Sequence, residues 1–119
     1  MSRKKLVSSY WNARKSLEED DLINSIKYLE IYSKELPEDI SYEPHYWLVG
    51  QYLKASNFVQ AFNSASLYLE GCTPAHAAIK AKLFSNWFHD KGSQEYSFAL
   101  IRLSSKYQKI QEELRKKSK

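Results

Sequence analysis

Apolar side chains recur at three- or four-residue spacing along most of the chain, in segments separated by short polar stretches. In residues 7–17 this spacing predicts an amphipathic helix, and the same pattern resumes in residues 22–36. The acidic run 18–21 interrupts the first pattern and supplies capping side chains for the second helix. Pro37 then ends that helix. The first third of the chain therefore predicts a pair of helices joined by a tight turn.

The remaining chain continues the same alternation of helical segments and turns. The spacing predicts four more helices, at 44–55, 58–70, 75–89 and about 94–115. Residues 56–57 and 90–93 form the expected turns, and Gly71 is expected to be a left-handed C-cap. Gly50 is expected to let a neighbouring helix approach closely. Together the six segments predict an all-α fold of three antiparallel helix-turn-helix hairpins.

The helical pairs form an internal repeat. Shifting the chain by 36 residues places Tyr10-Trp11 on Tyr46-Trp47. Other matching positions are Leu17 with Leu53, Leu22 with Phe58, Ile31 with Leu67, and Tyr32 with Tyr68. The third pair is more divergent, and its best match, from Phe58 to Tyr96, gives a spacing of about 38 residues. One hairpin cannot bury its apolar stripe, whereas a stack of three can.

The repeat resembles the tetratricopeptide repeat family. The resemblance is carried by Tyr46-Trp47-Leu48-Val49-Gly50, Asn57-Phe58-Val59-Gln60-Ala61 and Pro74, and the turn-aromatic-Ala part returns in Gly92 and Tyr96-Ser97-Phe98-Ala99. It covers about residues 6–110, with a longer period than the ~34 residues of that family. It implies a short right-handed α-solenoid whose concave groove holds a segment of another protein.

Length and composition favour one domain. A chain of 119 residues with 43% hydrophobic and 27% charged residues is typical of a single globular domain. We expect this domain at 6–115, with repeat units at about 6–39, 40–74 and 75–110, and basic tails at 1–5 and 116–119. Three Gly and three Pro are too few for a many-turned β-sandwich, and no Gly-rich phosphate loop is present.

The net charge of +4 is unevenly distributed. Residues 6–74 hold five basic and ten acidic residues, and residues 75–119 hold ten basic and four acidic ones. The basic ends either keep the chain in solution or attract polyanions weakly and without sequence preference.

Cysteine content and hydropathy indicate the cellular compartment that we expect for the chain. Cys72 is the single cysteine, expected to be small and partly buried, so no intramolecular disulfide is possible. No apolar segment follows the basic N-terminal residues as in a secretory signal, and no run of about 18 apolar residues predicts a membrane span. We therefore expect a cytoplasmic protein without membrane insertion.

The resemblance also implies a binding site. It places Tyr10 and Tyr46 in a buried aromatic slot and turns the adjacent tryptophans toward the groove. The expected partner-binding residues are Trp11, Asn12, Lys15, Trp47, Gln51 and Asn86. The alternative is that both tryptophans lie in the core between helices. Asn12, Arg14 and Lys15 fit the pattern of a clamp for an acidic C-terminal peptide in the first unit only. The second unit offers Gln51 and Lys54, so a complete clamp is not expected.

The sequence favours a non-enzyme without a metal or other cofactor. His45, His76 and His89 have no common helix-face spacing for a metal site, and the acidic pairs lie at helix boundaries as capping groups. No nucleophile–base motif is visible.

The predicted function is a protein–protein interaction module, an adaptor or chaperone-like protein that binds a peptide segment of a partner. One alternative is a self-associating structural protein, in which Trp87, Phe88 and the last helix form a homodimer patch. Another is a nucleic-acid-associated module that uses the basic third unit.

Overall fold

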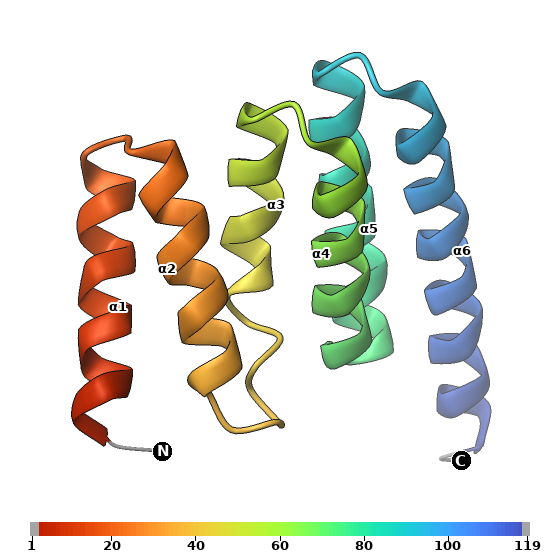
Figure 1. The fold of residues 1–119 in the computed structure, drawn as a ribbon. Coiled ribbons are helices and arrows are strands. Elements are labelled where there is room, and N and C mark those ends of the chain that lie inside the picture. Colours follow the sequence, from red (N-terminus) through yellow and green to blue (C-terminus); the bar gives the residue numbers. More distant parts are fainter. Residues whose placement is uncertain (1–2, 118–119) are drawn as a thin grey trace. The chain divides into compact units, whose positions relative to one another are not determined.

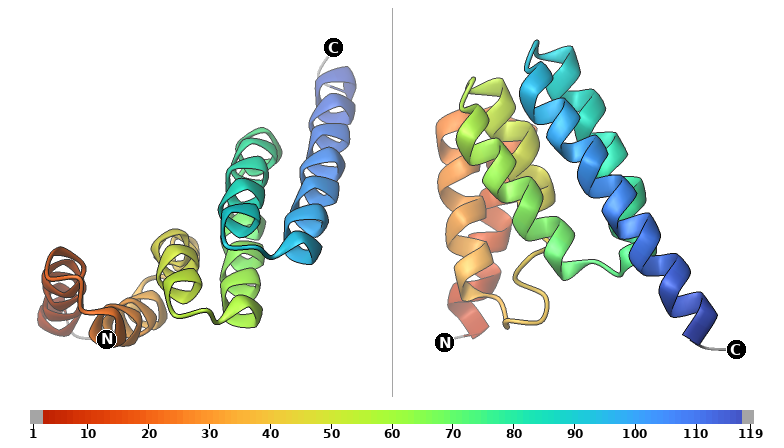
Figure 2. Two further views of the ribbon diagram at one scale, coloured as in Figure 1. Left: turned by 90° about the horizontal axis from the view of Figure 1, so that it is seen from above. Right: turned by 90° about the vertical axis from the view of Figure 1, so that its right-hand side faces the viewer.

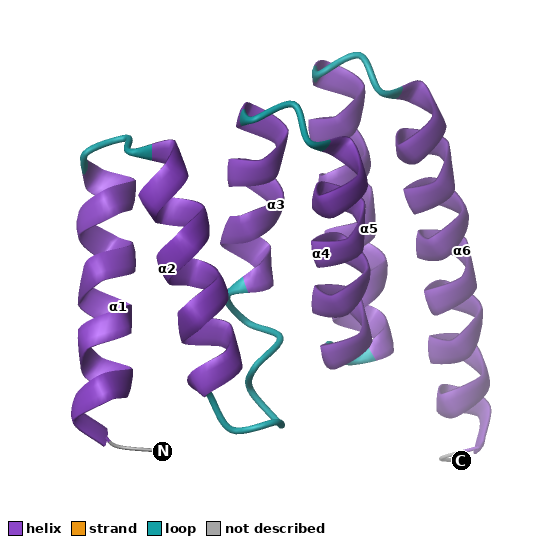
Figure 3. Ribbon diagram, in the orientation of Figure 1, coloured by secondary structure: helices purple, strands orange, loops and turns teal. Residues whose placement is uncertain are grey.

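The computed structural model describes residues 3–117, with side chains from Ser8 onward. Its regular structure consists of helices joined by loops, and the described residues contain no strand (Figures 1 and 3). The helices are α1 (Arg3–Glu18), α2 (Leu22–Glu35), α3 (His45–Lys54), α4 (Phe58–Gly71), α5 (Pro74–Asp90) and α6 (Gln94–Lys117). The all-α fold class predicted from the sequence is confirmed.

The helix ends agree with the predicted ends to within a few residues, except at the two ends of the chain. Residues 3–5, expected in a basic tail, form the first turn of α1, and α6 continues to Lys117. The rest of the two expected tails, residues 1–2 and 118–119, lies outside the described residues.

The chain divides into two compact units, residues 1–71 with α1 to α4 and residues 72–119 with α5 and α6. The predicted boundary between the second and third repeat units, after residue 74, lies three residues beyond this division. In the second unit α5 packs along α6, and a hydrogen bond from the Ser104 hydroxyl to the Ala78 carbonyl oxygen, 2.8 Å long, joins the two helices.

In the first unit, α1 packs on α2, α2 on α3, and α3 on α4. The view from above shows α1 and α3 on one side of this unit and α2 and α4 on the other (Figure 2). The buried residues of the unit include Ala13, Leu29, Leu48, Val49, Leu53, Ala61, Ala65 and Leu69. Several of them are small, as the close approach of neighbouring helices requires.

The turn within each hairpin repeats every 36 residues. Asp20, Ser56 and Gly92 have positive φ angles of 56°, 58° and 82°. The next residue in each turn donates its N–H to the carbonyl five positions earlier: Asp21 to Ser16, Asn57 to Tyr52, and Ser93 to Phe88, each at 2.9 Å. This is the Schellman arrangement, which uses carbonyl groups left unpaired at a helix end.

The regular turns correct two predictions. The second helix of each hairpin begins at residue 22, 58 or 94, so the spacing is 36 in both steps, and the expected spacing of about 38 is wrong. Gly71 is not a left-handed cap, because Gly92 is the glycine with positive φ in the described chain. Gly71 instead ends α4 beneath the Tyr42 side chain, which lies where a Cβ atom would project.

Candidate functional site

An open groove of about 500 Å³ lies within the first unit. One wall comes from α1, the opposite wall from the start of α3, and residues of α2 line the space between them. Its lining residues are Tyr10, Ala13, Arg14, Leu17 and Glu18 from α1, Leu29 and Tyr32 from α2, and Glu43, Pro44 and Trp47 from the start of α3 and the loop before it. The volume falls within the ~300–1,000 Å³ that is typical of ligand sites.

Aromatic rings form the largest apolar surfaces of the groove. The Tyr10 ring lies 5.5 Å from the Tyr32 ring and 5.5 Å from the Trp11 ring, measured between centroids. Tyr10 is 37% exposed, so the expectation that it fills a buried slot is wrong. Trp47, on the opposite wall, is 55% exposed.

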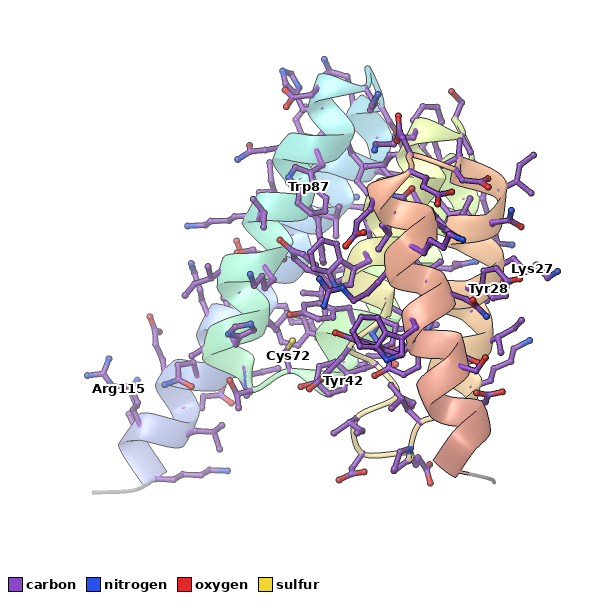
Figure 4. The ribbon with its side chains drawn as sticks, turned by 90° about the vertical axis from the view of Figure 1, so that its left-hand side faces the viewer. Lys27, Tyr28, Tyr42, Cys72, Trp87 and Arg115 are labelled. Atoms are coloured by element: carbon purple, nitrogen blue, oxygen red, sulfur yellow. The ribbon has the colours of Figure 1, made fainter. Side chains whose placement is uncertain are left out.

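The second hairpin repeats this ring arrangement 36 residues later. Tyr46 lies 5.4 Å from Trp47 and 5.5 Å from Tyr68. Here a further ring is present, because Tyr42 from the loop before α3 packs 5.6 Å from Tyr68. Figure 4 labels Tyr42 among the side chains of this region. Within the described residues no third ring contacts Tyr32, the residue equivalent to Tyr68.

Arg14 lies in the groove where the second hairpin has Gly50. Its guanidinium lies 5.5 Å from the Trp11 ring centroid and 5.9 Å from that of Tyr10. It also pairs with the Glu18 carboxylate at 3.6 Å and donates a 3.4 Å hydrogen bond to the Tyr10 hydroxyl. No described atom of another helix lies within 4 Å of the position that a Cβ atom of Gly50 would take, so the close helix approach expected there is wrong.

The electrostatic environment keeps the Tyr32 hydroxyl protonated. Burial raises the pKa of Tyr32, and the neighbouring Tyr10 and Glu43 raise it further. Because the ordinary pKa of a phenol is 10.0, this upward shift leaves the Tyr32 hydroxyl neutral throughout the physiological range.

His45 fixes the start of α3 against two other helices. Its Nε2 lies 3.2 Å from the Ser33 hydroxyl of α2, and its Nδ1 lies 3.4 Å from the Ser64 hydroxyl of α4. Burial lowers the pKa of His45, so the imidazole is neutral at pH 7. A hydrogen bond from the Tyr52 hydroxyl to Glu30 ties α3 to α2 as well. These contacts hold the Trp47 wall at a defined distance from α2.

The predicted partner-binding residues are only partly brought together. Trp11 and Trp47 are 58% and 55% exposed, so the alternative that both belong to the core is wrong. Trp47 lines the groove. Trp11 lies beside it, because its ring contacts the guanidinium of the lining residue Arg14.

The other four predicted residues lie outside the groove lining. Asn12 is half-buried, and exposed Lys15 pairs with Glu19 at 4.0 Å. Gln51 is buried within α3. Asn86 is exposed on α5, in the second unit.

Sequence reasoning missed most of the groove. Tyr32 carried a signal in the sequence, because the 36-residue shift aligned it with Tyr68, another aromatic residue. Arg14 stood out as the residue in the place of Gly50. Glu43 and Pro44 carry no periodic signal, because they lie in the connection between two hairpins.

The expected homodimer patch of Trp87, Phe88 and the last helix needs a correction. Phe88 is fully buried and packs on Tyr96 with ring centroids 5.7 Å apart, so it cannot form part of a dimer patch. The exposed large apolar side chains of this unit are instead Ile79, Phe98, Ile101 and Leu114.

Further features of the described residues concern metal binding, Cys72 and the outer face of α2. No three His, Cys, Asp or Glu side chains lie close enough together to hold a metal ion in this part of the chain. Cys72 is half-buried, as expected. Lys27 and Tyr28 extend outward from α2 (Figure 4), with the ammonium 5.4 Å from the ring centroid. Between residues 3 and 117, no helix has the length and apolar character needed to cross a bilayer.

No protein-family model, curated protein or solved structure matches the chain. The resemblance to the tetratricopeptide repeat family therefore rests on the sequence pattern and stays a prediction.

Proposed function

We propose that the chain is a non-catalytic protein–protein interaction module, of adaptor or chaperone-like type, which binds a peptide segment of a partner protein in the groove of the first unit. The observation that carries this proposal is the aromatic surface of the groove, with exposed Tyr10 and Trp47 on opposite walls and half-buried Tyr32 between them. Large, rigid aromatic side chains in a concave site are the residues that most often dominate binding energy at protein interfaces.

The proposal includes the finer architecture of a short right-handed α-solenoid of tetratricopeptide type. Its support is the repeated Schellman turn and the regular helix starts at residues 22, 58 and 94. The cytoplasmic location predicted from the sequence stays a prediction.

The test compares the full-length chain with its Trp47→Ala variant in affinity capture from a cell lysate. The capture is treated with nuclease and washed in high salt. Because Trp47 is more than half exposed, we expect its loss to abolish retention of the bound protein while the melting temperature changes little. Ile23→Ala is the matched control, because Ile23 is 80% exposed on α2 and does not line the groove.

Two results would contradict the proposal. Retention that is equal in the wild type and Trp47→Ala would show that the groove is not the binding site. Retention that disappears with nuclease or salt would favour the nucleic-acid alternative, in which the second unit, with ten basic and four acidic residues, attracts a polyanion.

Self-association is a second candidate, favoured by the exposed Phe98 and Ile101 side chains one turn apart on α6. It predicts a molar mass that rises with protein concentration and returns to the monomer value in Phe98→Ser. A constant monomer mass would exclude it.

A further inference from the structure

The charged groups that line the groove are not balanced. Arg14 is the single cation of the lining, and it is already engaged by Glu18 and by the Tyr10 and Trp11 rings. The Glu43 carboxylate forms no ion pair with any described residue. The groove therefore has one negative charge for which the described part of the chain provides no partner.

The charge of the whole unit has the same sign. Residues 1–71 hold eight Lys or Arg and ten Asp or Glu, a net charge of −2. Such a surface favours the approach of a basic segment and opposes an acidic one. Glu43 is exposed at the rim, so an incoming cation reaches it without being fully desolvated.

The second hairpin indicates what else the groove lacks. There, Tyr42 packs against Tyr68 and supplies a third ring. The equivalent Tyr32 lies in the groove lining beside Tyr10, and no third ring covers it within the described residues. The position equivalent to Tyr42 in the first hairpin is Leu6, which carries no ring, so an aromatic side chain from a ligand would supply the ring that Tyr42 supplies in the second hairpin.

A ligand that fits the groove therefore carries a positive charge for Glu43 and a large apolar side chain for Tyr32. We propose that the groove binds a linear segment of a partner protein that places a large apolar side chain against Tyr32 and an adjacent Lys or Arg beside Glu43. Tyr10, Tyr32 and Trp47 line the same groove as Glu43, and aromatic rings add attraction for a cation because their faces are electron-rich. This inference rests on the proposed function and specifies its ligand.

The groove is large enough for this ligand and too small for a folded domain. About 500 Å³ corresponds to a drug-sized ligand, which is comparable to two or three side chains. Specificity therefore comes from a short motif within the partner.

The experiment probes an array of random 12-residue peptides with the full-length chain. The variants are Glu43→Lys and its matched control Glu38→Lys. Glu38 is an exposed carboxylate in the same loop that does not line the groove, and its replacement changes the net charge by the same amount. The Trp47→Ala variant measures the peptide binding that does not depend on the groove. The array includes residues 106–117 of this chain, which contain Leu114 followed by three basic residues.

We expect the wild type and Glu38→Lys to select Lys or Arg next to a large apolar residue, and Glu43→Lys to select Asp or Glu at that position. For a selected peptide in solution, Glu43→Gln should weaken binding about fivefold, the effect of one partly exposed ion pair. Replacing the peptide's Lys by Gln should remove this difference between wild type and variant.

Other outcomes separate the inference from the proposed function. Trp47-dependent binding of acidic or uncharged peptides, or equal selection by the two Lys variants, would overturn the inference and leave the groove as a peptide site. Absence of any Trp47-dependent binding would overturn the proposed function itself. Preference for residues 106–117 over all other peptides would overturn the assignment of a separate partner, because the occupant would then be a second copy of this chain.

Discussion

The α1–α2 and α3–α4 hairpins contain the same three rings but cover them differently. Tyr10, Trp11 and Tyr32 in the first hairpin correspond to Tyr46, Trp47 and Tyr68 in the second, with ring spacings of 5.4–5.5 Å in both. In the second hairpin, Tyr42 from the connecting loop packs on Tyr68. In the first, Tyr32 lines an open groove. The repeat therefore explains the shared rings, and the connecting loop explains why Tyr68 has a further ring packed on it.

A second difference lies on the helices themselves. Arg14 occupies the position equivalent to Gly50. This position therefore carries a positive charge in the first hairpin and no side chain in the second. The same fold unit thus carries an additional ring on Tyr68 in the second copy and leaves Tyr32 in the groove lining in the first, while Trp47 of the second copy forms the opposite wall. The variants below test these differences, from the largest expected effect to the smallest.

Gly71→Ala should destabilise the packing of Tyr42 on Tyr68 in the second hairpin. The new Cβ would collide with the Tyr42 ring, and Tyr42 would have to leave Tyr68. We expect the free energy of unfolding to fall by about 1–3 kcal/mol, the usual cost of overpacking, as measured by urea denaturation.

Gly50→Ala is the matched control for Gly71→Ala. It places the same methyl group in open space within α3 and should raise the free energy of unfolding by ~0.5–1 kcal/mol. Equal effects of the two substitutions would show that Tyr42 does not hold the position described.

Ser25→Ala should stabilise the first hairpin by about 1 kcal/mol. The Ser25 hydroxyl is buried without a hydrogen-bond partner in the described structure. The equivalent residue of the second hairpin is Ala61, and that of the third is Ser97, whose hydroxyl lies 2.8 Å from that of Ser85. The position equivalent to Ser85 in the first hairpin is Ala13, which offers no such partner. Removing an unpaired buried hydroxyl removes its desolvation cost.

Ala61→Ser is the reverse substitution in the second hairpin and should lower the free energy of unfolding. Ala13→Ser should raise it, because the new hydroxyl would give the buried Ser25 hydroxyl a hydrogen-bond partner. Thermal denaturation of the three variants measures both effects. A destabilised Ser25→Ala would mean that its hydroxyl has a partner in solution.

The helices and the repeat were predictable because they depend on apolar periodicity, which extends over many residues. Alignment by aromatic similarity, from Phe58 to Tyr96, nevertheless displaced the third unit by two residues. The turns have no such ambiguity, because Asp20, Ser56 and Gly92 take the same backbone conformation at equal spacing. Gly92 shows this conformational preference clearly in its residue type, Asp20 does so more weakly, and Ser56 does not.

The site was less predictable than the fold. Trp47 was found from its helical position and the family resemblance, but Gln51, on the same helix, proved to be buried. The resemblance also placed Tyr10 in a buried slot, whereas it is a groove residue here. Glu43 comes from an irregular connection whose path depends on tertiary contacts such as those of His45, and no local pattern determines such a path.

The central claim, that the groove lined by Tyr10, Tyr32 and Trp47 is a peptide site, is tested most directly by ¹⁹F NMR of the chain labelled with 5-fluorotryptophan. Its three tryptophans, Trp11, Trp47 and Trp87, report on the groove rim, the groove wall and the second unit. Titration with a peptide selected on the array should shift the Trp47 resonance and leave that of Trp87 unchanged. Saturable binding that leaves the Trp47 resonance in place would contradict the claim.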